Sequence, residues 1–443
     1  MCWKAEYIVL IAIATLINYF AGLMMGRTSE ESERRKYLFL GLVGSLSILF
    51  GFKYFNFFNQ SLRTVFNSLN IFYDVPAFHV LLPVGISFYT FQALSYTIDV
   101  YRGDAEPEKD LGIFALYVSF FPQLVAGPIE RSRNLLPQFF ERHDFNYQDV
   151  TEGLKLMLWG FFKKIVIADR LALYVNQVYN NPADHTGLSV WLATYFFAFQ
   201  IYCDFSGYSD IAIGAARVMG YRLMTNFDRP YFSKSIIEFW RRWHISLSTW
   251  LRDYIFIPLN LQFRNFRSLG IGLSAFITFL LCGIWHGANW TFILWGILHG
   301  IFLIFSSITK NFRKACVNFF KLSNYPNLHK GFQLLITFHL VFFAWIFFRA
   351  NSISDAFILI RNMFKINLEL YSLKLSLTWY EISIAVVSIL FMEFIHLIQR
   401  KKDISKILSF EQVWVRWAFY YLLFFGILIL GQFNQTQFIY FQF

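Results

Sequence analysis

Charged residues are scarce in this sequence: Asp, Glu, Lys and Arg make up 15% of its 443 residues, and hydrophobic residues make up 56%. Soluble domains carry about a quarter charged residues, so a soluble exterior is hard to build from this composition. Uncharged apolar runs close to the ~20 residues of a membrane-crossing helix recur along the chain. They include Tyr7–Gly26, Val80–Ile98, Leu111–Ile129, Thr186–Cys203, Gly331–Phe348 and Ala418–Phe443. We predict an all-α polytopic transmembrane protein of about eleven spans, forming one integral membrane domain over residues 1–443.

Acidic residues are fewer still, since 28 Asp and Glu face 39 Lys and Arg, which gives a net charge of +11. In a soluble protein such an excess suggests nucleic acid as a partner, but here the charges lie in short loops between apolar runs. Anionic lipid headgroups and the positive-inside rule account for them better, and a phosphate-bearing cofactor is compatible. The rule places the basic loop Lys310–Lys330 on the cytoplasmic side. We expect a lipid bilayer and no nucleic acid as partners.

Cysteine is rare, and most catalytic motifs are missing. The four cysteines, Cys2, Cys203, Cys282 and Cys316, are far apart in sequence and are best explained as small packing residues. There is no Cys/His cluster and no HExxH sequence, so we expect no metal. Because no GxSxG elbow is present, a serine nucleophile is unsupported. The sequence also has no glycine-rich loop of the kind that binds nucleotide phosphates.

The segment Phe232–Leu259 differs from a simple span because it is amphipathic. Its tryptophans and leucines recur at helical spacing, and Arg241, Ser248 and Arg252 form one flank of the predicted helix. Such a helix lies in the membrane interface or borders a polar cavity, and we expect Pro258 to end it. The two arginines and the serine are candidates for binding the phosphates of a cofactor, and headgroup anchoring is the competing interpretation.

The segment Ser268–Thr309 contains no Asp, Glu, Lys or Arg and is too long for one span. Its pattern breaks at Trp285-His286-Gly287-Ala288-Asn289-Trp290, which predicts a re-entrant or recessed break. Irregular backbone at membrane depth is tolerated only beside protein or a water-filled cavity. We therefore expect His286 and Asn289 to be polar groups in a cavity within the bilayer.

His286 is the first candidate for catalysis, because ionisable residues at membrane depth are costly and usually functional. An imidazole with an ordinary pKa near ~6.5 suits a general base. Two roles remain possible for His244: a base or orienting group in the site, or a histidine of an amphipathic helix at the headgroup level. We expect His299 to be a packing residue. The patch Asp204-Phe-Ser-Gly-Tyr-Ser-Asp210 is explained by helix capping as well as by ligand binding.

Six stretches of the chain resemble one family, the membrane-bound O-acyltransferases. They are LPVGISFYTFQALSYTIDVYRG at 82–103, FFPQLVAGPIERSRNLLPQF at 120–139, IYCDFSGYSDIAIGAARVMGY at 201–221, NFDRPYFSKSIIEFWRRWHISLSTWLRDYIFIPL at 226–259, GIWHGANWTFILWGILHG at 283–300 and FFRANSISDAF at 347–357. The resemblance covers most of residues 82–357. Within the family, the WHGANW and RRWHISLSTW sequences are similar to the branch that acetylates alginate.

This resemblance implies helices around a central funnel that crosses the bilayer, with His286 as the catalytic histidine and His244 as the second. It implies acetyl-CoA as the cytoplasmic donor, a polysaccharide acceptor outside the bacterial inner membrane, and a secreted or membrane-anchored esterase-like partner. One departure is that Asn260 and Leu261 stand where the branch has two glycines, which puts the turn geometry there in doubt.

Two alternatives stay open. A sister branch of the family transfers D-alanine from a carrier protein to teichoic acid. A polysaccharide export or transport protein, with intramembrane histidines relaying protons, is the alternative of another class. The absence of visible internal repeats disfavours a transporter built from inverted repeats.

Overall fold

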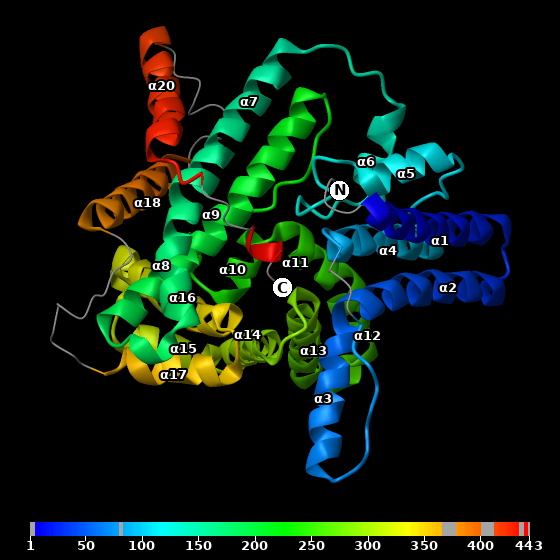
Figure 1. Cartoon of the computed structure of the whole chain (residues 1–443), viewed down its shortest axis with the longest axis horizontal. Coiled ribbons are helices and arrows are strands. Elements are labelled where there is room, and N and C mark those ends of the chain that lie inside the picture. The colour runs from blue at the N-terminus through cyan, green and yellow to red at the C-terminus, as the bar shows by residue number, and fades with distance from the viewer. Residues whose placement is uncertain (1–4, 79–82, 366–377, 400–411, 434–437, 442–443) are drawn as a thin grey trace. The chain divides into compact units, whose positions relative to one another are not determined.

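The computed structural model describes residues 5–78, 83–365, 378–399, 412–433 and 438–441 (Figure 1). Within these ranges every regular element is helical, which confirms the all-α class. Eight helical stretches in the described ranges are long and apolar enough to span a membrane: Ile8–Arg27, Glu31–Ser68, Leu188–Val218, Ser268–His286, Trp290–Ile308, Pro326–Arg349, Trp379–Ile398 and Val413–Leu430. The protein is therefore a multi-pass membrane protein, and the total of about eleven spans stays a prediction. The end of the predicted span Ala418–Phe443 lies partly outside the described residues.

The contacts divide the chain into two compact units. The first comprises residues 1–146 and 219–224, and the second comprises residues 147–218 and 225–443. Each is described by itself.

In the first unit, α1 (Ile8–Arg27), α2 (Glu31–Leu49) and α4 (Ile86–Arg102) pack together (Figure 1). Asn18 of α1 joins them, since its amide nitrogen donates to Ser45 Oγ at 2.8 Å and its oxygen accepts from Thr97 Oγ1 at 2.6 Å. Such hydrogen bonds between apolar helices satisfy polar groups that lipid cannot.

The remaining helices of this unit are α3 (Phe55–Ser68), α5 (Leu111–Ser119) and α6 (Ser132–Leu135). The predicted span Leu111–Ile129 is wrong as a single helix, because α5 ends at Ser119. Pro122 follows closely, and a residue that precedes proline avoids the helical conformation.

The second unit is built around two long antiparallel helical rods. The first contains α7 (Tyr147–Phe161), a π-helical turn (Phe162–Ala168) and α8 (Asp169–Asn180), and the second is α9 (Leu188–Val218). Glycines let the backbones meet: a Cβ added to Gly160 would lie 2.6 Å from the carbonyl oxygen of Gly207, and one added to Gly153 would lie 2.6 Å from that of Gly214. Small residues at a helix interface are the usual means of close packing in membranes.

Buried ion pairs join the same two rods. Lys163 Nζ, which is 3% exposed, lies 2.7 Å from Asp210 and donates to Ser206 Oγ at 2.9 Å. Lys164 Nζ lies 2.7 Å from both Asp169 and Asp204. The explanation of Asp204 or Ser206 as a helix cap is therefore wrong, because both lie inside α9, where no backbone N–H needs a cap.

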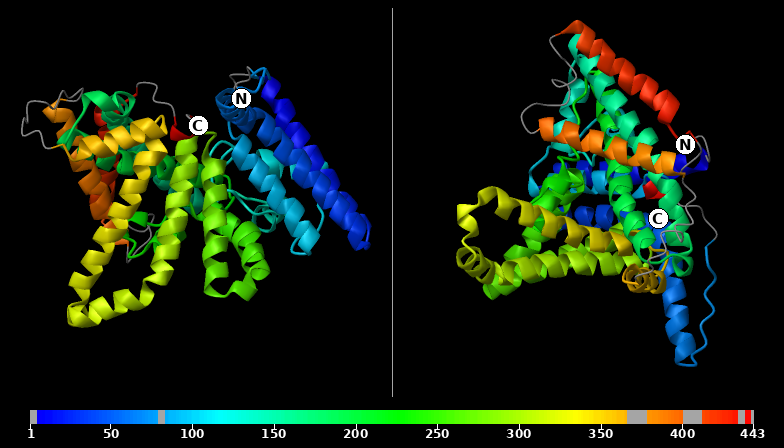
Figure 2. Two further views of the ribbon diagram at one scale, coloured as in Figure 1. Left: turned by 90° about the horizontal axis from the view of Figure 1, so that it is seen from below. Right: turned by 90° about the vertical axis from the view of Figure 1, so that its left-hand side faces the viewer.

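The position of the predicted break in Ser268–Thr309 is confirmed, whereas its recessed depth in the membrane stays a prediction. Helix α13 (Ser268–His286) and helix α14 (Trp290–Ile308) form a hairpin, and α16 (Pro326–Arg349) packs beside α14 (Figure 1, Figure 2). Each arm has 19 residues. At ~1.5 Å per residue each arm is long enough to cross the hydrocarbon core, so the break lies at the turn of a hairpin. The other helices of this unit are α15 (Lys310–Phe319), α17 (Ile353–Met363), α18 (Trp379–Gln399) and α20 (Val413–Leu430).

The single helix predicted over Phe232–Leu259 is wrong. The segment forms α10 (Ile236–Arg242) and α11 (Ile245–Leu251), and α11 continues through a π-helical turn into α12 (Ile257–Gln262). The break comes from His244, whose φ of 42° and ψ of 56° are left-handed. Pro258 does not end a helix: it is the second residue of α12, directly after the π-helical turn Arg252–Phe256. Asn260 and Leu261 are helical, so no turn forms where the family has glycines.

Candidate active site

His286 is the last residue of α13 and is buried in an aromatic cage within the second unit. Its ring lies 5.0 Å from those of Trp285 and Trp295, 5.1 Å from Phe348 and 5.8 Å from Tyr440, measured between centroids. The rings of Trp295 and Phe348 stand nearly perpendicular to the imidazole. These neighbours fix the orientation of the imidazole ring and surround it with aromatic groups.

His244 is fully buried between α10 and α11, and a polar triad fixes its orientation. Asn226 Oδ1 accepts from the backbone N–H of Ser246 at 3.2 Å and lies 3.1 Å from His244 Nδ1. Because a backbone N–H can only donate, the Asn226 atom is an oxygen, and Nδ1 must carry the proton. The lone pair of neutral His244 is therefore on Nε2. Burial lowers the pKa of His244 to about 3, so the neutral form is the resident one.

Tyr440 and Trp285 bring the two histidines into one site. Tyr440 lies 5.8 Å from His286 and 6.4 Å from His244, and Trp285 lies 5.0 Å and 6.1 Å from the same two rings. The pairing of His286 with His244 is thus a direct outcome of the fold. Tyr440 was not among the candidates, because an aromatic residue in an aromatic-rich sequence gives no signal of its own.

The ion pairs of α9 hold Tyr440 in place. Asp204, paired with Lys164, accepts a hydrogen bond from the backbone N–H of Ile439 at 2.8 Å. Tyr440 also packs on Phe205 at 4.5 Å. The Asp204–Lys164 pair therefore positions a residue of the site through the backbone next to it.

Asn289 is the N-cap residue of α14 and lines a cavity of ≈ 500 Å³ in the same unit. Its side-chain oxygen accepts from the N–H of Thr291 at 3.0 Å, which is an ordinary helix cap. Its nitrogen donates to the carbonyl of Asn351 at 3.0 Å. Asn289 therefore lines a polar cavity, as expected, whereas His286 does not line it and lies in its own aromatic cage, with Phe348 contributing to both. The depth of the cavity in the bilayer stays a prediction.

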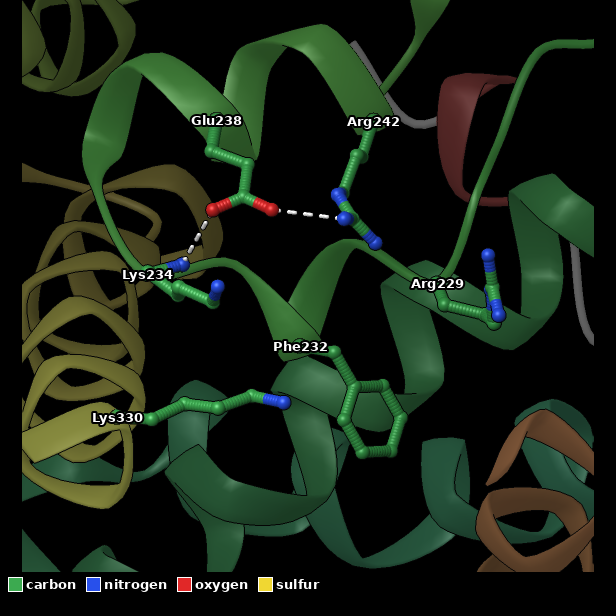
Figure 3. A pocket seen from close by; sticks show the side chains of 6 residues that line it. All are labelled: Arg229, Phe232, Lys234, Glu238, Arg242 and Lys330. Atoms are coloured by element: carbon green, nitrogen blue, oxygen red, sulfur yellow. Dashed lines mark hydrogen bonds and ion pairs between the residues drawn. The ribbon is translucent and has the colours of Figure 1, made fainter. Parts of the chain in front are cut away.

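A second, basic pocket of ≈ 280 Å³ lies beside α10. Figure 3 shows its lining, which combines four cations with one acid and one ring: Arg229, Lys234, Arg242, Lys330, Glu238 and Phe232. The Glu238 carboxylate accepts from Arg242 at 2.7 Å and from the backbone N–H of Lys234 at 2.9 Å. Asp228, which adjoins the pocket, pairs with Arg229 at 2.8 Å and lies 4.0 Å from Arg242. Four cations against these two carboxylates still leave an excess of positive charge that suits an anionic ligand.

The three residues predicted to bind the cofactor lie near this pocket in sequence but do not line it. Arg241 is exposed at the end of α10. Arg252 is 58% exposed and pairs with the adjacent Asp253 at 2.7 Å. The Ser248 hydroxyl donates to the carbonyl of Trp243 at 3.0 Å. Sequence reasoning missed Arg229 and Lys234, which lie just before α10, and Lys330, which comes from α16.

His299 has the packing role expected of it. It is fully buried in α14, and its Nδ1 accepts a hydrogen bond from Trp240 Nε1 at 3.2 Å. Cys203 and Cys282 are also buried, as expected of packing residues, whereas Cys2 lies outside the described residues. Across the part of the chain that the structure describes, no group of three or more His, Cys, Asp or Glu side chains is arranged to hold a metal ion.

Comparison with known proteins adds independent information. A family model described as "MBOAT, membrane-bound O-acyltransferase family" matches residues 110–349. A Pseudomonas putida protein named "Probable alginate O-acetylase AlgI" is 37% identical over 100% of this chain and 91% of its own length. Its namesake in Pseudomonas aeruginosa is 39% identical over 82% of this chain and 67% of its own length. A Helicobacter pylori "Peptidoglycan O-acetyltransferase" is 31% identical over 82% of this chain and 71% of its own length.

Proposed function

This chain belongs to the membrane-bound O-acyltransferase family, and we propose that it moves an acetyl group from cytoplasmic acetyl-CoA to the outer side of a bacterial inner membrane. The group would serve the O-acetylation of an exported or cell-surface polysaccharide. The observation that carries this proposal is the shared site of His286 and His244, both held against Tyr440 and Trp285. The names of the alginate and peptidoglycan relatives support acetyl as the group and a polysaccharide as the final acceptor.

In the proposed reaction, His286 is the general base. An acceptor hydroxyl loses its proton to the imidazole while its oxygen attacks the thioester carbonyl carbon. The carbon–sulfur bond then breaks, and the coenzyme A sulfur takes up a proton. His244, with its lone pair on Nε2, would orient the acceptor or the thioester. Asn289 is proposed to stabilise developing charge at the mouth of the cavity.

For the donor, we propose that the basic pocket binds the phosphates of coenzyme A. Its Lys330 ends the basic loop Lys310–Lys330, which the positive-inside rule assigns to the cytoplasm. Arginine forks and lysine ammonium groups are the usual phosphate ligands. Arg241, Arg252 and Ser248 remain proposed as further contacts along the same basic surface, outside the pocket.

Charge reversal in this pocket is expected to weaken donor binding. Arg242→Glu or Lys330→Glu should raise the KM for acetyl-CoA by about 10-fold or more, since a hydrogen bond to a charged group is worth about 1.5–3 kcal/mol. The kcat should change much less, because neither residue touches the reacting atoms. Initial rates in proteoliposomes at varied acetyl-CoA concentration measure both constants.

Three further variants make the comparison specific. Lys314→Glu, on exposed α15, alters the same net charge away from the pocket and should leave KM unchanged. Arg241→Glu and Arg252→Glu test the contacts outside the pocket and should raise KM less than the pocket variants. Equal KM values for wild type and both pocket variants would remove the donor from this pocket.

The proposal includes a secreted or membrane-anchored esterase-like partner that completes transfer to the polysaccharide. Purified protein in proteoliposomes, supplied with labelled acetyl-CoA, is expected to release coenzyme A faster when the partner and polysaccharide are present outside. Label in the polysaccharide supports the proposal. Label from D-alanyl carrier protein instead of acetyl-CoA would favour the teichoic acid branch, and absence of transfer from either donor, with polymer still moved across the membrane, would favour an export protein.

We also expect activity without a metal ion. The histidines of the site are surrounded by aromatic rings, and metal sites need several ligands at defined spacing. Exhaustive treatment with EDTA and then 1,10-phenanthroline should leave the acetyl transfer rate unchanged. A loss of activity that added zinc restores would contradict this expectation.

A further inference from the structure

The cavity beside the turn between α13 and α14 contains a buried cation that has no counter-ion. Arg349, the last residue of α16, lines this cavity and is only 8% exposed. Its guanidinium donates to Asn176 Oδ1 at 2.7 Å, to Asn351 Oδ1 at 3.3 Å and to Asn180 Oδ1 at 3.4 Å, and it lies over the ring of Tyr179 at 5.6 Å. All these partners are neutral, and in the ranges that the structure covers no Asp or Glu pairs with Arg349.

A buried, uncompensated cation is costly, because amide dipoles replace only part of the hydration that a charge loses. If Arg349 served only to join α8 to the end of α16, a neutral side chain with donors could do so at lower cost. An anion that enters the cavity would supply the missing charge. A guanidinium binds a carboxylate through two parallel hydrogen bonds, so a carboxylate is the anion that this side chain fits best.

The asparagines of α8 add hydrogen-bond donors beside this cation. Asn176 and Asn180 lie one helical turn apart and turn their side-chain oxygens to Arg349, so their amide N–H groups can serve a ligand. Residues one turn apart on a helix are about 5–6 Å from each other. The carbonyls on one side of an extended peptide recur at about 6.7 Å, a similar interval. A carboxylate on a peptide matches these groups better than a lone anion does.

The cavity and the basic pocket lie at opposite ends of one helix. Lys330, near the start of α16, lines the basic pocket, and Arg349 ends this helix of 24 residues. At ~1.5 Å per residue α16 is about 36 Å long, which exceeds the ~30 Å of the hydrocarbon core. Because the positive-inside rule assigns the basic loop Lys310–Lys330 to the cytoplasm, we expect the cavity on the outer side of the membrane.

We propose that this cavity is the docking site for an acidic loop of the esterase-like partner, with Arg349 on an Asp or Glu carboxylate and the asparagines of α8 on the peptide backbone. This inference rests on the proposed function and assigns a surface to its partner. Phe348 connects the cavity to the catalytic cage, since its ring lines the cavity and meets the His286 ring at 5.1 Å. Docking at this cavity therefore brings the partner to within one aromatic ring of the proposed base.

Two synthetic peptides test this independently of catalysis. The acidic probe is N-acetylated and C-amidated Gly-Ser-Gly-Asp-Gly-Ser, and the neutral probe carries Asn in place of Asp. Each is titrated by calorimetry into the full chain in phosphatidylcholine nanodiscs. Wild type is expected to bind the acidic probe at least about 10-fold more tightly, as one charged hydrogen-bonded contact predicts.

Four variants locate the preference. Asn176→Asp puts a carboxylate where Asn176 Oδ1 accepts from Arg349, so the cavity neutralises its own cation and should no longer prefer the acidic probe. Asn181→Asp adds the same charge at an exposed position directly after α8 and should keep the preference. Arg349→Gln should bind the two probes equally, whereas Arg361→Gln, an exposed arginine of α17, should keep the preference.

The outcomes separate this inference from the proposed function. Equal or undetectable binding of the two probes by wild type would overturn it even if Arg349→Gln does not fold, and so would a preference that survives in Asn176→Asp. Displacement of the acidic probe by phosphatidylglycerol in the nanodiscs, or by coenzyme A, would assign the cavity to a lipid headgroup or to donor phosphates and overturn it too. Failure of acetyl transfer alone, with the probe preference intact, would count against the proposed function and leave the docking site standing.

Discussion

Replacement of His286 by alanine is expected to reduce acetyl transfer by about 10²–10⁴-fold, the usual contribution of a positioned general base. A hydroxyl that attacks a thioester must lose its proton as the new bond forms, and the His286 ring is fixed by Trp285, Trp295 and Phe348. Binding of acetyl-CoA should be unchanged, because the basic pocket and the aromatic cage of His286 have no residue in common. Transfer rates in proteoliposomes, normalised to folded protein, measure the effect.

His244→Ala is the matched comparison, because His244 shares Tyr440 and Trp285 with His286. We expect a smaller loss for an orienting group than for the base. The His286→Gln variant keeps the size and a hydrogen-bonding head but no basic nitrogen, so it should be as impaired as His286→Ala. Near wild-type transfer by both His286 variants would refute the assignment, and an inactive His244→Ala protein would then move the base to His244.

Replacement of Lys163 by methionine is expected to cause the largest loss of stability among single substitutions in α7–α9. It leaves Asp210, whose side chain is 22% exposed, without the partner 2.7 Å away. Removing one member of a buried ion pair costs about 3–5 kcal/mol. For a chain of this size that corresponds to a decrease in Tm of about 3–5 °C. Thermal unfolding in detergent, monitored by tryptophan fluorescence, measures this decrease in Tm.

Two controls define the cause. The double variant Lys163→Met, Asp210→Leu removes both charges and should regain most of the lost stability, since apolar residues replace a buried pair at little cost. Lys155→Met, farther along the same rod and partly exposed, should change the Tm by far less. A double variant that is no more stable than Lys163→Met would show that the loss comes from packing rather than from an unpaired charge.

The sequence predicted those features that depend on local patterns. Long uncharged runs identified most of the spans, and the polar sequence at His286–Asn289 located the turn between α13 and α14. The burial of Trp240, Trp243, Leu247, Trp250 and Leu251 follows from their spacing. Their regular spacing nevertheless hid the break at His244, because a single left-handed residue leaves no trace in a hydrophobic pattern.

Features that depend on long-range contacts could not be predicted. Asn226 fixes His244 from the segment before α10, and Tyr440 reaches the site from beyond α20. Arg349 is one arginine at the end of an apolar run, and only the fold places Asn176 and Asn180 around it. Likewise the basic pocket combines Lys330 with Arg229 and Arg242, which no spacing in the sequence connects.

The glycine contacts between α7 and α9 also create an ambiguity of register. Gly153 meets Gly214 and Gly160 meets Gly207, so the glycines of each helix are one heptad apart. Sliding one helix by that interval would set Gly153 against Gly207 and preserve a close crossing. The ion pairs of Lys163 with Asp210 and of Lys164 with Asp204 form only in the native alignment. Buried polar residues fix the alignment of coiled coils in the same way, so these charges specify which of two similar packings the rods adopt.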